Sequence, residues 1–390
     1  MINFNICNFK CFYDTSVKLN GLTVLAGSNG FGKSSVVQAL LFMRRTIEHC
    51  AKWNNTCYTD DLDFGLNVEL NGAYCLALGN SKNIIPVEAP QNSLLSLELR
   101  ENDNKCRISY KLNDDFAELW LTPIKDNTSF SGQYSNLPIF LKEFYYLNAE
   151  RFGPRVTQPI KFHDYFNVGW QGEYCAQILS DYGSVKNFKV EKDRLFNPED
   201  ENLNKSLLRQ TQEWMGYLMP RVVVDSRKDD NMLSAQILVE NSYTKGEPVI
   251  ATNIGFGISY VLPIIITGLI AKKGAIMVVE NPEAHLHPSA QSRIGQFLAR
   301  IAQSGVKVIV ETHSDHVING MQIAAAQAKI NNELISVNYF SERDADSEFP
   351  QPNIEEISIN KKGELTNWPK GFFDQTQMDF AELFRLRHNE

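Results

Sequence analysis

The sequence predicts an α/β fold with a mixed central sheet, a separate antiparallel β lobe and a helical insertion. Two apolar runs rich in β-branched residues, 275–280 and 306–311, are typical of buried parallel strands, and each ends in a glutamate. A shorter apolar run, 22–26, precedes a glycine-rich turn and a segment with helical spacing. Between residues 64 and 121, short strand-like segments alternate with polar turns, which predicts an antiparallel sheet packed on the central one.

The glycine-rich turn spans residues 27–34 and matches G-x-x-x-x-G-K-[ST], the pattern of a phosphate-binding loop. Its glycines permit positive φ angles, and the helix that follows adds unpaired N–H donors and the positive end of its dipole. We therefore expect Lys33 to contact the β- and γ-phosphates of ATP and Ser34 to bind Mg²⁺. The residues predicted to bind the nucleotide here are Gly27, Ser28, Asn29, Gly30, Phe31, Gly32, Lys33, Ser34 and Ser35.

The remaining elements follow from periodicity and breaker residues. Residues 2–9 alternate as an edge-type strand, and 17–26 are expected to return toward the phosphate loop. A strand is predicted over 143–149, a charged and irregular loop over 186–204, and a helix over 207–218 that serves as a packing face. No sustained heptad is present, so a long coiled-coil arm is not expected.

The two glutamate-ended strands bring polar groups to one edge of the predicted sheet, where ligands of parallel sheets bind. Glu280 ends the first strand and is suited to hold Mg²⁺ directly or through water. The second strand leads into Thr312-His313-Ser314, which places His313 at the same edge. Upstream, Gly255-Phe256-Gly257 opens an apolar helix, and a Gly-x-Gly turn at a helix N-terminus is a further anion-binding arrangement.

Composition limits the class of protein. A chain of 390 residues that is 43% hydrophobic can bury a large core and is long for one lobe, so two lobes are expected. The formal net charge of −8 argues against a broadly basic nucleic-acid surface. The seven cysteines form no C-x-x-C pair, which favours reduced thiols. The first residues lack a signal-peptide pattern, and the apolar run 261–271 is too short for a bilayer, so we expect a cytoplasmic protein without membrane partners.

The order of these motifs resembles that of the ABC-type ATPase heads. This group includes the structural-maintenance-of-chromosomes (SMC) and recombination-repair ATPases and the overcoming-lysogeny-defect proteins. The chain is most similar to single-head prokaryotic AAA-family ATPases that end in the domain of unknown function 3696. The segments that carry this likeness, besides the nucleotide motifs, are 8–12 (NFKCF), 146–154 (YLNAERFGP) and 368–374 (WPKGFFD).

The resemblance implies a P-loop NTPase of the ABC-ATPase head type, with ATP and Mg²⁺ as cofactors. It makes 27–34 the Walker A loop, 255–257 the signature motif with Gly255 and Gly257, and 285–288 the D-loop equivalent. It also makes Glu280 the Walker B acid and His313 the switch histidine near the γ-phosphate, and it places Lys10 beside the nucleotide. In such heads two chains sandwich two ATP molecules, so the resemblance implies a homodimer that forms on ATP.

One position departs from the pattern of this group. Where two consecutive acids are common, Glu280 is followed by Asn281, whose amide can orient a water molecule but cannot accept its proton. Glu283 is a candidate substitute base, and slow hydrolysis is the other interpretation. Glu280, Glu283 and His313 are therefore the predicted catalytic residues.

Other polar groups have competing interpretations. His285 and His287 form an H-x-H pattern without a third ligand at fitting spacing, which favours packing over metal binding. Glu342, Asp344 and Asp346 resemble the acidic cluster of a topoisomerase–primase nuclease domain. Only about 45 residues follow them, too few for a further α/β domain, so a solvated turn is favoured. Arg151 either has a structural role, pairing with a buried acid, or faces a phosphate.

Four regions are predicted: an ATPase lobe with the phosphate loop (1–165), a helical insertion (166–220), a second ATPase lobe (221–340) and a C-terminal segment (341–390). The predicted function is an ATP-dependent dimeric switch that controls a nuclease or another protein effector in prokaryotic anti-phage defence. The alternatives are a DNA repair or recombination ATPase that acts on DNA directly, and a low-turnover ATP-binding scaffold.

Overall fold

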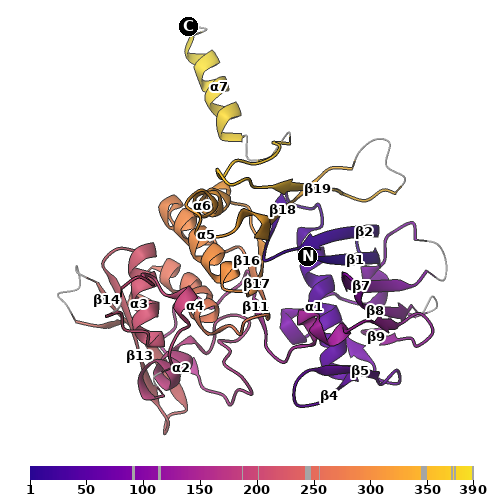
Figure 1. The fold of residues 1–390 in the computed structure, drawn as a ribbon, viewed down its shortest axis with the longest axis horizontal. Helices are drawn as coiled ribbons and strands as arrows, with labels where there is room; N and C mark the ends of the chain where they lie inside the picture. The colour runs from indigo at the N-terminus through magenta and orange to yellow at the C-terminus, as the bar shows by residue number, and fades with distance from the viewer. Residues whose placement is uncertain are drawn as a thin grey trace.

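The computed structural model describes residues 1–89, 93–112, 116–186, 188–200, 202–241, 247–253, 255–343, 349–369, 372 and 375–388. Figure 1 shows a β-rich lobe formed by the N-terminal third, a central sheet covered by helices, and a lobe of mixed structure built by the middle of the chain. Asp344 and Asp346 of the predicted acidic turn lie outside the described residues, as does most of the predicted motif 368–374.

The described strands have the following bounds: β1 Ile2–Phe9, β2 Phe12–Leu19, β3 Leu22–Gly27, β4 Ala51–Trp53, β5 Tyr58–Leu62, β6 Val68–Glu69, β7 Leu95–Glu101, β8 Asn104–Lys111, β9 Trp120–Pro123, β10 Ser129–Ser131, β11 Phe144–Leu147, β12 Gln158–Pro159, β13 Val222–Asp229, β14 Ser234–Asn241, β15 Val249–Ile250, β16 Ile276–Glu280, β17 Lys307–Glu311, β18 Ile335–Ser341 and β19 Asn353–Ser358. The α-helices are α1 Lys33–Cys50, α2 Cys175–Ile178, α3 Leu207–Leu218, α4 Phe256–Ile270, α5 Pro288–Gln303, α6 Asp315–Ala326 and α7 Gln375–His388. A π-helix, Leu179–Val185, continues α2.

The central sheet is six-stranded, in the order β11-β16-β17-β3-β18-β19. The first five strands are parallel, and β19 is antiparallel to β18, so the predicted mixed sheet is confirmed. The strand that precedes the phosphate loop, β3, lies between β17 and β18, which come from the last third of the chain. Its apolar side chains, including Leu22 and Val24, are buried because helices and the β lobe cover both faces.

The antiparallel sheet has the order β2-β1-β7-β8-β9-β6, with β10 paired to β8. The prediction of an edge strand at 2–9 is wrong, because β1 lies between β2 and β7. Residues 17–26 do lead back to the phosphate loop, but they are divided between β2 and β3. The chain turns at Asn20 and Gly21, where the Asn20 side chain accepts the Gly21 N–H at 2.9 Å, so β2 and β3 enter different sheets.

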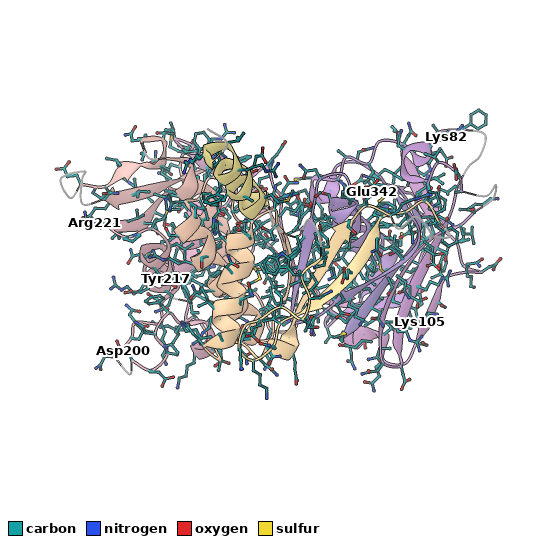
Figure 2. All side chains as sticks on the ribbon, turned by 90° about the horizontal axis from the view of Figure 1, so that it is seen from above. Lys82, Lys105, Asp200, Tyr217, Arg221 and Glu342 are labelled. Carbon is teal, nitrogen blue, oxygen red and sulfur yellow. The ribbon has the colours of Figure 1, made fainter. Side chains whose placement is uncertain are left out.

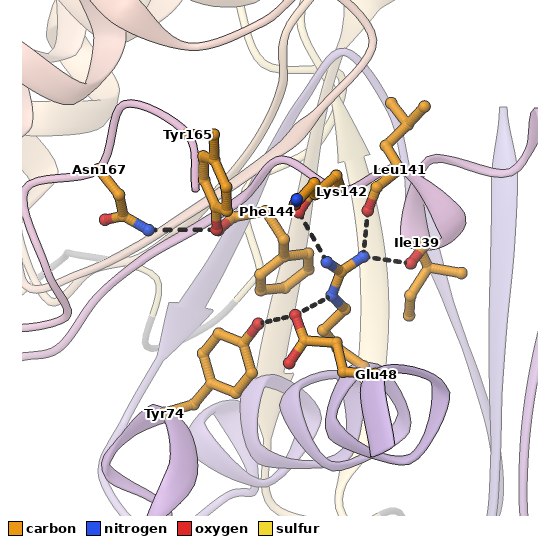
Figure 3. Close-up of polar contacts among 9 residues, drawn as sticks. Glu48, Tyr74, Ile139, Leu141, Lys142, Phe144, Tyr165 and Asn167 are labelled. Atoms are coloured by element: carbon orange, nitrogen blue, oxygen red, sulfur yellow. Dashed lines mark hydrogen bonds and ion pairs between the residues drawn. The ribbon is translucent and has the colours of Figure 1, made fainter. Parts of the chain in front are cut away.

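A buried arginine joins α1 to the strand at the edge of the central sheet (Figure 3). Arg44 on α1 is fully buried, and its guanidinium donates to Glu48 and to three backbone carbonyls of the segment before β11, those of Ile139, Leu141 and Lys142. Glu48 also accepts the hydroxyl of Tyr74 at 2.6 Å. Because every Arg44 nitrogen has a partner, the charge is compensated inside the core. The helix that opens at the phosphate loop is thereby fixed to the far edge of the sheet.

The third lobe packs on the helices of the central sheet. Its helix α3 lies against α4 and α5, and the β13–β14 hairpin packs on α3 and α2. Tyr217 on α3 (labelled in Figure 2) bonds Gln296 on α5 at 3.0 Å, and Arg293 of α5 donates to the Tyr217 carbonyl at 2.8 Å. The predicted helix over 207–218 is confirmed and buries Trp214 and Met215 as its packing face.

Helix α7 projects away from the rest of the molecule (Figure 1). It exposes several large apolar side chains: Met378, Phe380, Leu383, Phe384 and Leu386. No helix in the described ranges is both long enough and apolar enough to cross a membrane. All seven cysteines are free thiols.

Candidate functional site

The loop between β3 and α1 has the backbone shape that its glycines predict. Gly27, Gly30 and Gly32 have φ angles of 132°, 86° and 88°. A Cβ atom on Gly27 would lie 2.1 Å from the carbonyl oxygen of Phe340, so no other residue fits there. Gly32 caps α1 without a side-chain hydrogen bond, which leaves the first N–H groups of the helix available to an anion.

Lys33 is the first residue of α1 and curls back over the loop. Its ammonium donates to the carbonyl oxygens of Gly27 at 2.9 Å and Ser28 at 2.7 Å. Burial lowers the pKa of Lys33, and the nearby carboxylate of Glu311 opposes that shift. The lysine is therefore held at the mouth of the loop by neutral acceptors, which a phosphate group can replace.

A polar cavity of about 240 Å³ lies against this loop. Its lining residues are Lys10, Cys11, Asn29, Gly30, Gly32, Lys33, Ser34, Ser35, Glu311 and His313. Eight predicted residues are thus brought together, whereas Gly27, Ser28 and Phe31 shape the loop without lining the cavity. This cavity fits a nucleoside triphosphate and its Mg²⁺, because backbone N–H donors, a lysine and a serine hydroxyl surround one concave space.

The β1–β2 turn supplies one wall of the cavity. Lys10 has a φ angle of 53°, and its ammonium donates to Gln38 of α1 at 2.6 Å. Burial lowers the Lys10 pKa. Cys11 is next to it, and a Cβ on Gly32 would lie 2.7 Å from the Cys11 sulfur. The turn therefore packs directly on the phosphate loop and presents Lys10 to the cavity.

Glu311 is a cavity residue that is absent from the sequence-based set. It ends β17 and accepts the hydroxyl of Ser34 at 2.6 Å, although 277 residues separate the two. The glutamate is 4% exposed, and burial raises its pKa. Its sequence signal is the one that selected Glu280: an apolar strand that ends in a carboxylate just before polar residues.

Glu280 is beside Glu311, since the two are Cα partners across β16 and β17. Its carboxylate accepts the Tyr146 hydroxyl and the Ala149 N–H, both at 3.1 Å. Burial, with a smaller contribution from Glu311, raises its pKa to about 7. Glu280 does not line the cavity, so its predicted metal-binding role stays a prediction.

Glu283 holds the segment after β17. Its two oxygens accept the Thr312 hydroxyl and the His313 N–H, both at 2.7 Å. His313 lines the cavity, and burial together with Lys33 lowers its pKa, so the imidazole is neutral at neutral pH. Glu283 therefore fixes the backbone of His313, the predicted switch histidine, and the predicted role of Glu283 as a base stays a prediction.

Arg151 has a structural environment. It is 3% exposed and donates to the carbonyl oxygens of Asn148, Glu280 and Asn281, the last two at 2.6 Å. Of the two interpretations of Arg151, the geometry favours the structural one, with backbone carbonyls as partners. Asn281 has a φ angle of 43°, and its side-chain oxygen is buried without a hydrogen-bond partner among the residues that the structure describes.

The predicted signature residues lie away from the cavity of their own chain. Gly255 caps α4, and a Cβ added to it would meet nothing within 4 Å. A Cβ on Gly257 would lie 2.9 Å from the His285 carbonyl, so the helix start packs on the predicted D-loop. His287 caps α5 by accepting the Ser289 N–H. Within the described ranges, no group of three histidine, cysteine or acidic residues is arranged to hold a metal ion.

Comparisons with known proteins agree with this geometry. Residues 22–319 match the AAA_21 family model, described as "AAA domain, putative AbiEii toxin, Type IV TA system", and residues 330–383 match a protein family of unknown function, DUF3696. No curated protein matches the chain. An SMC head bound to the C-terminal winged-helix domain of ScpA has the same fold, with a TM-score of 0.50 and 14% identity over 92% of this chain and 98% of that one.

Two further SMC head structures match the chain less well. The Smc head domain with an extended coiled coil, bound to the C-terminal domain of ScpA derived from Pyrococcus furiosus, gives a TM-score of 0.49 at 12% identity over 99% of this chain and 100% of that one. The Thermotoga maritima head gives 0.43 at 11% identity over 92% and 98%. From the family match and the phosphate-loop geometry together, the chain belongs to the AAA_21 family of ATPase domains, has the fold of an SMC-type ABC ATPase head, and ends in a DUF3696 segment.

Proposed function

We propose that this protein binds ATP with Mg²⁺ in the cavity at the phosphate loop and hydrolyses it. The observation that carries the proposal is the convergence of Lys33, Ser34 and His313 on one polar cavity beside a helix start without a side-chain cap. These are the groups that hold a triphosphate, bind its metal ion and reach its terminal phosphate. The family match supports the same chemistry.

The proposed roles follow from position. The N–H groups from Gly30 to Ser34 hold the phosphate oxygens, and Lys33 exchanges its two carbonyl partners for phosphate. The Ser34 hydroxyl would hold Mg²⁺ when the nucleotide is bound, and the ion would supply charge neutralisation at the transferred phosphoryl group. His313 donates a hydrogen bond toward the terminal phosphate, while Glu283 keeps its backbone in place.

We further propose that turnover by the isolated protein is slow. Asn281 stands where a second acid would accept the proton of the attacking water, and an amide cannot do so. Both Glu283 oxygens are already engaged by Thr312 and His313, which argues against a free base there. A nucleotide that stays bound for long suits a switch.

The switch proposed here is a cytoplasmic homodimer. The N-terminus of α4 is open at Gly255, and Phe256 beside it is 54% exposed. These residues are outside their own chain's cavity, so they are free to cap the nucleotide of a second copy, as the resemblance to ABC heads implies. We propose that this closure controls a protein effector such as a nuclease in anti-phage defence.

A direct test uses Lys33→Ala and measures ATP affinity and phosphate release. The variant removes the charge that offsets the triphosphate, so we expect at least a tenfold loss of ATP affinity. Lys52→Ala is the matched control, because Lys52 is 77% exposed and pairs with Asp61 away from the cavity. Unchanged ATP binding by Lys33→Ala would refute the site. Phosphate release with and without a candidate nuclease then separates an ATPase switch from a passive scaffold.

A further inference from the structure

A second cavity, of about 320 Å³, lies at the edge of the central sheet opposite the phosphate loop. Its walls come from the start of β11, the end of α4 and the third-lobe segments around residues 165 and 190. Among the described residues, it shares no lining side chain with the nucleotide cavity. Concave sites of about 300 to 1,000 Å³ between lobes are typical of small-molecule binding. We propose that this cavity binds a small organic carboxylate with a flat apolar body.

The polar wall of the cavity is a buried arginine with one unsatisfied nitrogen. Arg194 is 1% exposed; its Nε donates to the Ser304 hydroxyl at 2.9 Å, and its Nη1 donates to the Ala271 carbonyl. Its Nη2 is buried and has no hydrogen-bond partner in the described part of the chain. The carboxylate of Glu191 lies 3.6 Å from Nη2, too far for a hydrogen bond, and its side chain is 58% exposed. A buried, charged N–H group without an acceptor is costly, so this nitrogen calls for an anion.

The other fully buried arginine shows what complete compensation is like in this fold. Every Arg44 nitrogen has a hydrogen-bond partner. Burial lowers the Arg44 pKa, but the nearby Tyr74 and Glu48 raise it further than burial lowers it. At Arg194 burial also lowers the pKa, and Glu191 opposes that shift only in part. A ligand carboxylate that displaces the exposed Glu191 side chain would bring an oxygen within hydrogen-bond distance of Nη2.

The remaining walls of the cavity are largely aromatic. Tyr145 and Tyr165 meet edge to face, with 5.7 Å between their ring centroids. Phe166 and Phe188 form a second edge-to-face pair at 5.3 Å. The Tyr165 hydroxyl donates to the Phe144 carbonyl at 2.8 Å, so this tyrosine offers its ring to a ligand (Figure 3). Aromatic walls pack best on flat apolar groups, which defines the body of the ligand.

The other charged groups of the cavity select a carboxylate over a phosphate. Lys272 pairs with both oxygens of Glu143, at 3.0 and 3.2 Å, so its charge is already compensated. Arg194 is therefore the cation that the ligand meets. A doubly charged phosphate would be repelled by Glu143 and Glu191, whereas a single carboxylate replaces Glu191 with an equal charge.

The test titrates the full chain, without nucleotide, with phenylacetate and with its neutral amide, phenylacetamide, by isothermal titration calorimetry. We expect the acid to bind roughly tenfold more tightly than the amide, because only the acid forms a charge-assisted pair with Arg194. Arg194→Met should abolish this preference. Glu191→Gln should tighten binding of the acid about two- to fivefold, because it removes the competing carboxylate of a weak ion pair.

Glu213→Gln is the matched control and should leave the affinity for phenylacetate unchanged, since Glu213 pairs with Arg209 on α3 and is not part of the cavity wall. Lys33→Ala should also leave it unchanged, which separates this cavity from the phosphate loop. If Arg194→Met fails to fold, Glu191→Gln decides, because the expected gain requires a cation behind Glu191. Equal affinities for acid and amide, no binding of either, weaker binding by Glu191→Gln, or loss of binding in Lys33→Ala would each overturn the proposal.

Discussion

We expect the rate of ATP hydrolysis to depend on the side chain of Asn281. It follows Glu280 at the end of β16 in a left-handed conformation, which asparagine and aspartate tolerate better than most residues. We expect Asn281→Asp to accelerate phosphate release roughly 10- to 100-fold, because it supplies a carboxylate of matched size that can accept the water proton. Steady-state phosphate release at saturating ATP measures the change.

Two results would contradict this expectation. Rapid turnover by the unmodified protein with no gain in Asn281→Asp would show that a base is already present. Complete loss of turnover in Glu283→Gln, with His313 still in place as judged by unchanged ATP affinity, would identify Glu283 as that base.

The raised pKa of Glu280 predicts that the free energy of unfolding changes with pH. Burial raises its pKa from 4.5 to about 7, so the folded state binds the proton more tightly than the unfolded state. The resulting stabilisation is complete below the unfolded pKa and is lost as the pH rises through about 7, a change of about 3 kcal/mol. We expect Glu280→Gln to remove this loss in urea denaturation measured in EDTA between about pH 5 and about pH 8. Parallel pH profiles for the variant and the unmodified protein would contradict it.

At the residue scale, the sequence predicted those site residues whose roles depend only on neighbouring positions in the chain. The phosphate-loop residues are contiguous and carry their own backbone requirements, so the pattern alone places Lys33 and Ser34. Glu311 reaches Ser34 across 277 residues, and that contact depends on which strand lies next to β3. Glu280 and Glu311 have equal local signals, and only the strand order separates them.

Helices α5 and α6 cross so closely that glycines of each helix lie against the backbone of the other. A Cβ on Gly320 would lie 1.9 Å from the Ser292 carbonyl oxygen, and one on Gly295 would lie 2.1 Å from that of Val317. We expect Gly320→Ala to lower the free energy of unfolding by about 1 to 3 kcal/mol or more, because the helices must separate. Gly216→Ala in α3 is the matched control.

Gly216 is a helix-interior glycine whose added Cβ would have its nearest neighbour at 4.0 Å. Its replacement should raise stability by roughly 0.5 to 1 kcal/mol, since alanine loses less backbone entropy in a helix. Urea midpoints at fixed pH measure both variants. Equal effects of the two substitutions would show that the α5–α6 crossing is looser than the geometry indicates.

At the element scale, apolar runs and periodicity predicted the buried strands β16 and β17 and the helices α3 and α4. They did not predict that β1 is an interior strand, because edge status depends on β7, which begins at residue 95. The break between β2 and β3 lies at the Asn20–Gly21 turn, a local signal that the interpretation of residues 17–26 as a single segment did not use.

For the whole molecule, the prediction concerns assembly. We expect a non-hydrolysable ATP analogue with Mg²⁺ to shift the protein from monomer toward dimer in light scattering. Gly255→Arg should abolish the shift, because an arginine at the open start of α4 fills the space that a facing phosphate would need. Gly255→Ala should leave it intact, since its Cβ meets nothing within 4 Å. A single mass under all conditions would contradict the dimer, and a shift retained by Gly255→Arg would place the interface elsewhere.

The strand order of the central sheet also determines how the protein is made. The phosphate loop leaves the ribosome early, but its strand β3 acquires neighbours only when β17 and β18 emerge about 300 residues later. At typical synthesis rates this is a delay of roughly 15 to 60 s. During that time the apolar β3 and α1 must be sheltered by the β lobe or by chaperones. A nascent chain released before β18 would carry the complete phosphate-loop sequence and still lack one of the two strands that flank β3.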